Sequence, residues 1–111
     1  MLYILNTLIV PIDFDRFSQR DVTFRRITVE EARWILQRNP DFISAVGHQG
    51  TAQVLSRILG VEIPAERRTI FMEPGDRAIH FFLKQRLPEG RVLTAEELEK
   101  LDYWLVLSEV W

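Results

Sequence analysis

The chain has 111 residues, of which 47% are hydrophobic, and a formal net charge of −2 at pH 7. This length and composition predict a single globular domain over residues 1–111 and argue against disorder. Because cysteine is absent, disulfides, cysteine-ligated zinc and thiol nucleophiles are excluded, and the 2 histidines are too few for a histidine-rich metal cluster within one subunit. The net negative charge argues against coating a long nucleic acid, but it leaves room for a small anion held by local arginines. The lack of a membrane-spanning run or a signal-peptide pattern predicts a cytoplasmic protein with no membrane partner.

The first third of the chain predicts two strands. An apolar strand is expected over residues 1–8, with Asn6 as its one polar break and Pro11 as its end. Residues 13–19 favour a loop or a short helical turn. Residues 22–27 alternate in polarity and predict the second strand.

The middle of the chain predicts two helices around one more strand. Thr28 and Glu31 form a capping-box pattern, in which each side chain satisfies the other residue's free amide, so a helix is expected from there to about Arg38. Residues 42–46 read as a short buried strand. A second helix then follows His48 and should stop at Gly60.

The last third predicts a hairpin, a turn, a helix and a closing strand. Strands are expected over residues 68–72 and 77–83, joined by a turn at residues 73–76. A further turn, a second capping box and a last strand are expected over residues 87–90, 94–97 and 103–110. The pattern predicts an α/β fold: a mixed sheet of five to six strands with about three helices packed on it.

The segment from Ala45 to Thr51 places one histidine, His48, where a strand ends and a helix begins. Gly47 and Gly50 leave little side-chain bulk over the backbone N–H groups, which lack helical partners and favour an anion. A histidine beside such an anion can hold or deliver a proton near neutral pH. The pattern therefore indicates phosphate chemistry, although a histidine at this place more often caps or packs.

A second stretch, from Gln85 to Gly90, brings Arg86 and Glu89 into one turn. The arginine fork suits phosphate oxygens, and the glutamate can orient the arginine or accept a proton from an attacking hydroxyl. Arg67 and Arg68 could add charge to the same pocket. The alternative for Arg86 and Glu89 is a solvated ion pair that contributes little energy. The alternative for Arg67 and Arg68 is a charged loop.

The remaining histidine and the aromatic residues have simpler interpretations. His80 lies between apolar residues of an expected strand, so we expect it to have a structural partner. Trp34, Trp104 and Trp111 are expected in the core or at a dimer contact.

Taken in order, these motifs resemble those of the viral anti-CRISPR ring nucleases and their cellular and phage-borne relatives. The resemblance covers roughly residues 44–111, and the first strand more loosely. It rests on the following segments: Ala45–His48, Leu59–Gly60, the spacing to Arg67, Glu73–Asp76 with Ala78, Gln85–Gly90, Val92–Leu93 and Glu109–Trp111. One departure is Gln49-Gly50, where some members carry small hydroxyl residues, so backbone N–H contacts are expected there.

The resemblance implies an activity, the residues that perform it and a partner. Members of that family degrade cyclic tetra-adenylate, the second messenger of type III CRISPR systems. By similarity, His48, Arg86 and Glu89 match the catalytic residues. Asn6 and Arg67 resemble ligand contacts, and the full set of expected substrate contacts comprises Asn6, Gly47, Gln49, Gly50, Thr51, Arg67 and Gln85.

The implied reaction is attack of a ribose 2′-hydroxyl on the adjacent phosphorus. It needs no metal or cofactor and gives linear di-adenylates with 2′,3′-cyclic phosphate ends. A two-fold homodimer could match the rotational symmetry of the ring. Two other functions stay open: a module that binds the cyclic oligoadenylate with negligible turnover, and a small interaction protein without a nucleotide ligand.

Overall fold

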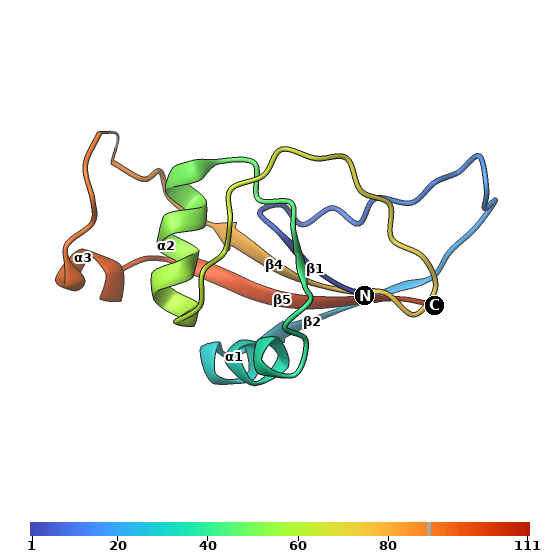
Figure 1. Ribbon diagram of the computed structural model, residues 1–111, viewed down its shortest axis with the longest axis horizontal. Helices are drawn as coiled ribbons and strands as arrows, with labels where there is room; N and C mark the ends of the chain where they lie inside the picture. The colour runs from blue at the N-terminus through green and yellow to red at the C-terminus, as the bar shows by residue number, and fades with distance from the viewer. Residues whose placement is uncertain (89) are drawn as a thin grey trace.

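The computed structural model describes residues 1–88 and 90–111, and Figure 1 shows their arrangement. The described strands are β1 (Leu2–Leu5), β2 (Val22–Ile27), β3 (Ile43–Ser44), β4 (Arg77–Leu83) and β5 (Tyr103–Val110). The described helices are α1 (Val29–Gln37), α2 (Gln49–Leu59) and α3 (Ala95–Glu99). The strands form one five-stranded sheet in the order β2-β5-β4-β1-β3.

The sheet is mixed, as the sequence predicts. Strand β1 runs parallel to both β3 and β4, whereas β5 runs antiparallel to β4 and β2. The predicted α/β class, strand number and helix number are thereby confirmed.

The two faces of the sheet are covered differently. Ile79 and Phe81 of β4 point toward the helices and belong to the main core, together with buried residues of α1 and α2. Because side chains alternate along a strand, Ala78 and His80 point to the opposite face. There Ala78 packs in a smaller cluster with Leu5, Met72 and Val110. Two long connections contribute to this cluster, and they are joined by a 2.8 Å hydrogen bond from the Met72 N–H to the Pro11 carbonyl.

The helix ends follow the predicted caps, with one exception. The Thr28 hydroxyl accepts the Glu31 N–H at 3.1 Å, but the Glu31 carboxylate bonds Arg25, so the predicted reciprocal capping box is wrong at α1. An arginine on the neighbouring strand β2 offers this carboxylate a charged donor, which forms a stronger bond than a backbone amide. At α3 the reciprocal box is present. Gly60 ends α2 in the left-handed conformation with φ of 71°.

The predicted strand over residues 68–72, and with it the hairpin, is wrong. Strand β4 lies between β5 and β1, so both of its hydrogen-bonding edges are already filled. Residues 68–72 instead run as a connection without regular structure. The predicted turn is present: the Asp76 N–H bonds the Glu73 carbonyl at 2.9 Å, and the chain then enters β4.

Two strands are shorter than predicted. Strand β1 ends at Leu5, and the Thr7 carbonyl bonds the His80 ring at 2.6 Å in place of a neighbouring strand. Strand β3 comprises only Ile43–Ser44, and Val46 makes an isolated parallel bridge to Ala65.

The tryptophans differ in their environment. Trp34 and Trp111 are 54% and 60% exposed, so of the two expected places, the core and a dimer contact, the dimer contact is the one left for them. The Arg38 guanidinium lies 3.7 Å from the Trp34 ring centroid, a cation–π contact at the surface of α1. Trp104 stacks on Phe82. No helix within the described part of the chain is long and apolar enough to cross a bilayer.

Candidate functional site

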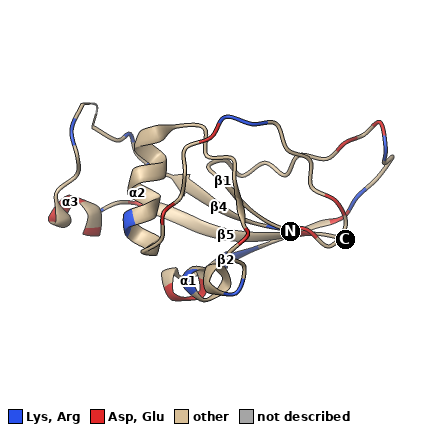
Figure 2. Cartoon of the chain, viewed as in Figure 1, with Lys and Arg blue, Asp and Glu red and all other residues tan. Residues whose placement is uncertain are grey.

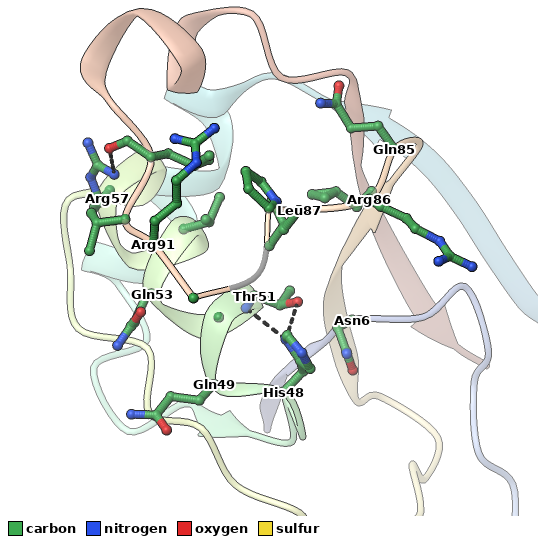
Figure 3. A pocket seen from close by; sticks show the side chains of 17 residues that line it. Asn6, His48, Gln49, Thr51, Gln53, Arg57, Gln85, Arg86, Leu87 and Arg91 are labelled. Atoms are coloured by element: carbon green, nitrogen blue, oxygen red, sulfur yellow. Dashed lines mark hydrogen bonds between the residues drawn. The ribbon is translucent and has the colours of Figure 1, made fainter.

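An open cleft of about 990 Å³ lies at the amino end of α2 and the carboxyl ends of β1 and β4 (Figure 3). Strands β1 and β4 are parallel, so residues that follow them reach the same edge of the sheet. The cleft is lined by most of the predicted site residues: Asn6, His48, Gln49, Gly50, Thr51, Gln85 and Arg86. Glu89, predicted as a catalytic residue, lies outside the described residues.

His48 is the N-cap of α2. Its backbone is extended, and its ring Nδ1 accepts the backbone N–H of Thr51 at 3.2 Å. The Thr51 hydroxyl oxygen lies 3.1 Å from the same nitrogen. The capping role that the sequence left open is therefore present, and it fixes the ring at the edge of the cleft.

The cap determines which ring nitrogen carries the proton. A nitrogen that accepts an N–H must have a free lone pair, so the neutral ring of His48 is protonated at Nε2. When the ring is charged, Nε2 is protonated as well. While the cap is intact, the Nε2 atom of His48 can therefore donate a proton or a hydrogen bond but cannot accept one.

Gly50 allows the His48 ring to lie close to the helix. A Cβ at position 50 would lie 3.1 Å from Cε1 of the ring, closer than ordinary van der Waals contact. The N–H of Thr51 is used by His48, but those of Gln49 and Gly50 have no protein partner among the described residues. These two amides, at the positive end of α2, remain suited to an anion.

Asn6 lies beside His48 at the rim of the cleft (Figure 3). The loop that carries it is held by His80, whose Nδ1 donates to the Thr7 carbonyl at 2.6 Å. The Nε2 atom of His80 accepts from the Ser108 hydroxyl at 2.7 Å, and both side chains are fully buried. Burial lowers the pKa of His80, so the ring is neutral at neutral pH. The predicted structural role of His80 is confirmed.

Gly47 and Arg67 line a separate shallow groove of about 410 Å³ that shares Asn6 with the main cleft. The Arg67 Nε donates to the Gly47 carbonyl at 3.1 Å, and its side chain covers the position where a Cβ of Gly47 would stand. Arg68 also lines this groove, and its side chain pairs with Glu66. The predicted contacts therefore lie along two adjoining depressions.

Arg86 and Gln85 border the cleft, yet their side chains do not converge on His48. In Figure 3 the Arg86 guanidinium points away from His48, and Gln85 points away from the cleft. The Gln85 amide oxygen accepts the N–H of Asp102 at 2.9 Å, which ties it to the start of β5. In this conformation the structure brings together Asn6, His48 and Thr51 but keeps Arg86 apart from them.

Sequence reasoning missed three polar residues that line the cleft. Gln53 and Arg57 follow Gln49 at intervals of four and therefore share its helical face, a spacing that could have revealed them. Arg57 donates to the Leu93 carbonyl at 2.8 Å. The third, Arg91, pairs with Glu97.

Arg91, one of the arginines that line the cleft, is compensated by its ion pair with Glu97. The pKa of Glu97 is lowered to about 2, chiefly by its hydrogen bond from Arg91 and then by that from Thr94. Figure 2 shows the charged residues spread along the chain. Within residues 1–88 and 90–111, no group of three or more histidine or carboxylate side chains is placed to hold a metal ion.

The chain is similar to several viral proteins. Uncharacterized protein 26 of Sulfolobus islandicus filamentous virus is 44% identical over 111 residues, covering 99% of this chain and 92% of that protein. Uncharacterized protein ORF117 of Acidianus two-tailed virus is 45% identical over 105 residues, covering 93% of this chain and 87% of that protein. B116 of Sulfolobus turreted icosahedral virus (STIV) has the same fold, with a TM-score of 0.81 at 21% identity and 97% of each chain covered. The model of the STIV B116-like family matches residues 2–105, so this chain belongs to the STIV B116-like family.

Proposed function

We propose that this chain is a ring nuclease that opens cyclic tetra-adenylate without a metal ion and so switches off type III CRISPR signalling. The observation that carries the proposal is the state of His48. Its Nδ1 is bonded to the first turn of α2, and its Nε2 is left as a proton donor at the edge of an open cleft. Cleavage of a phosphodiester by a neighbouring hydroxyl needs such a donor for the leaving oxygen.

The proposed step forms one bond and breaks another. A ribose 2′-oxygen attacks the adjacent phosphorus, the bond from phosphorus to the 5′-oxygen breaks, and a 2′,3′-cyclic phosphate forms. Protonated His48 gives its Nε2 proton to the 5′-oxygen, which leaves as a hydroxyl. The proton of the 2′-hydroxyl goes to a base other than His48, because the charged ring carries a proton on both nitrogens and cannot accept another. Glu89 is the residue proposed for this role, either directly or by orienting Arg86.

Binding of the phosphate groups of cyclic tetra-adenylate is assigned to three sets of groups. The free amides of Gln49 and Gly50 take phosphate oxygens. Asn6 donates its side-chain amide from the rim shared by the two depressions. Arg86 stabilises charge on the phosphoryl oxygens once its side chain has turned toward the cleft.

Incubation of the chain with cyclic tetra-adenylate and a chelator, followed by chromatography, tests the proposal. The expected products are linear di-adenylates with 2′,3′-cyclic phosphate and 5′-hydroxyl ends. An intact ring, or cleavage only after a divalent metal is added, contradicts it. A ring that stabilises the chain in a thermal-shift assay separates a ligand-binding protein from one without a nucleotide ligand.

A second candidate function is capture of the ring with negligible turnover. The orientation of Arg86 favours it, because the guanidinium points away from His48 in Figure 3. Single-turnover assays with excess protein and labelled ring distinguish the two. Capture predicts tight binding and a ring that stays intact through many binding lifetimes, whereas the nuclease converts all of the bound ring.

A further inference from the structure

We propose that Thr51 is a positioning residue for His48: its hydroxyl accepts the Nδ1 proton of the charged ring and so holds the ring in its acid form. The observation is a pair of contacts at one nitrogen. The Nδ1 atom of His48 lies 3.2 Å from the Thr51 backbone nitrogen and 3.1 Å from the Thr51 hydroxyl oxygen. The proposal rests on the nuclease function proposed above. The sequence predicts Thr51 only as a substrate contact.

The backbone amide of Thr51 supports only one of the two charge states of the ring. An N–H group always donates, so it bonds Nδ1 in the neutral ring and faces another N–H in the charged ring. The charged ring therefore loses its cap bond unless an acceptor is within reach. An unpaired donor held against another donor would turn the ring away from its position.

The hydroxyl of Thr51 supports both states. A hydroxyl can donate to the bare Nδ1 and can accept from a protonated Nδ1 after its own hydrogen rotates away. The distance of 3.1 Å suits either bond. The Thr51 hydroxyl thus satisfies Nδ1 in the resting neutral ring and in the charged ring. After Nε2 has given its proton to the leaving oxygen, Nδ1 is still protonated and still donates to the hydroxyl, so Nε2 stays at the cleft throughout.

Within residues 1–88 and 90–111, no charged acceptor is recorded at the His48 ring that could replace the Thr51 hydroxyl. Gly50, where an added Cβ would lie 3.1 Å from Cε1 of the ring, has no side chain. Arg67 donates to the Gly47 carbonyl, and a guanidinium cannot accept a proton from the ring. Among the described residues, the Thr51 hydroxyl is the acceptor recorded within hydrogen-bonding distance of Nδ1.

The kinetic test compares two substitutions at this position. Thr51→Val keeps the shape and the backbone N–H but removes the hydroxyl, and Thr51→Ser keeps the hydroxyl. We expect Thr51→Val to lower the single-turnover rate on saturating cyclic tetra-adenylate by about 10- to 100-fold, the effect of losing one hydrogen bond to a charged group. The affinity for cyclic tetra-adenylate should change less than threefold. Thr51→Ser should have most of the wild-type rate. Thr23→Val, which removes a hydroxyl from β2 bonded to Trp111, is the matched control and should retain the wild-type rate.

A spectroscopic measurement tests the contact independently of cleavage. In the ligand-free wild-type chain at alkaline pH, the ¹⁵N shifts of His48 should show a proton on Nε2 and none on Nδ1. A proton on Nδ1 overturns the proposal, as does a wild-type rate in Thr51→Val. A lower rate that arises only from weaker binding of cyclic tetra-adenylate also overturns the proposal, since that is the effect of a substrate contact. Failure of the wild-type chain to cleave the ring is a different result and overturns the proposed nuclease itself.

Discussion

At the scale of single residues, position 50 decides how closely the His48 ring can approach α2. The Cβ of alanine there would lie 3.1 Å from Cε1, so the ring must shift by a few tenths of an ångström away from the Thr51 amide. We expect Gly50→Ala to lower the cleavage rate about tenfold, because small misplacements of a catalytic group are costly. Alanine forms helices better than glycine, so the free energy of unfolding should not fall. Single-turnover kinetics and urea unfolding of the same preparation measure the cleavage rate and the free energy of unfolding. An unchanged rate contradicts the close approach of the His48 ring to Gly50.

The buried His80 gives a pH dependence of stability. Its pKa is lowered by burial, so the unfolded chain, with a histidine pKa of about 6.5, binds a proton more readily than the folded chain. The contribution of the neutral His80 to the free energy of unfolding is therefore fully present above about pH 6.5. It is lost as the pH drops toward the pKa of His80 in the folded chain.

We expect the urea midpoint of the wild-type chain to be lower at pH 5.5 than at pH 7.5. His80→Gln keeps a donor for the Thr7 carbonyl and should show a smaller change between the two pH values. If the variant does not fold, ¹⁵N shifts of His80 in the wild-type chain measure the same protonation. An equal pH effect in both chains, or a His80 pKa in the folded chain that is not below that of an unfolded histidine, is the opposite result.

The sequence revealed some site residues and not others for physical reasons. His48 could be found because glycines and a helical pattern surround it, and the structure makes it the N-cap of α2. Its tautomer could not be found, because that depends on the position of one amide in the folded helix. The orientation of Arg86 also could not be found, since a long side chain at the end of a strand has many rotamers. Glu89 stays a prediction.

At the scale of elements, the helices were easier to predict than the strands. Helix ends depend on local signals, and Thr28, Thr94 and Gly60 all act where the sequence places them. Whether a segment is a strand depends on a free edge of a neighbouring strand, which local sequence does not contain. Residues 68–72 have strand-like composition, but β4 has no free edge for them.

One arginine links α2 to the segment that follows β4. Arg57 donates to the Leu93 carbonyl at 2.8 Å in a partly buried contact. Arg57→Met should increase hydrogen exchange of amides 90–94 about tenfold or more, because a hydrogen bond from a charged donor resists local opening. Arg33→Met is the matched control: it removes the 2.6 Å bond from an arginine to the Ile58 carbonyl, which ties α1 to α2. Equal exchange of amides 90–94 in the wild-type chain and Arg57→Met contradicts this role.

At the scale of the whole molecule, the site is open along one edge, and its contacts are divided between two adjoining depressions. A ring of four nucleotides has rotational symmetry, and a two-fold dimer could present one set of catalytic groups to each half. We therefore expect a homodimer that binds one ring per two chains. Light scattering and calorimetry check this, and a monomer that binds one ring per chain contradicts it even if the ring is cleaved.

The most direct measurement is the single-turnover rate of His48→Asn on cyclic tetra-adenylate in the presence of a chelator. Asparagine can cap α2 through its side-chain oxygen but has no titratable nitrogen. We expect a rate about 10²–10⁴ lower than that of the wild-type chain, with nearly unchanged ring affinity and unfolding free energy. His48→Ala should lose the rate and also about 0.5–2 kcal/mol of stability, because the cap is gone. A His48→Asn variant that cleaves the ring at the wild-type rate would show that His48 serves only as a helix cap.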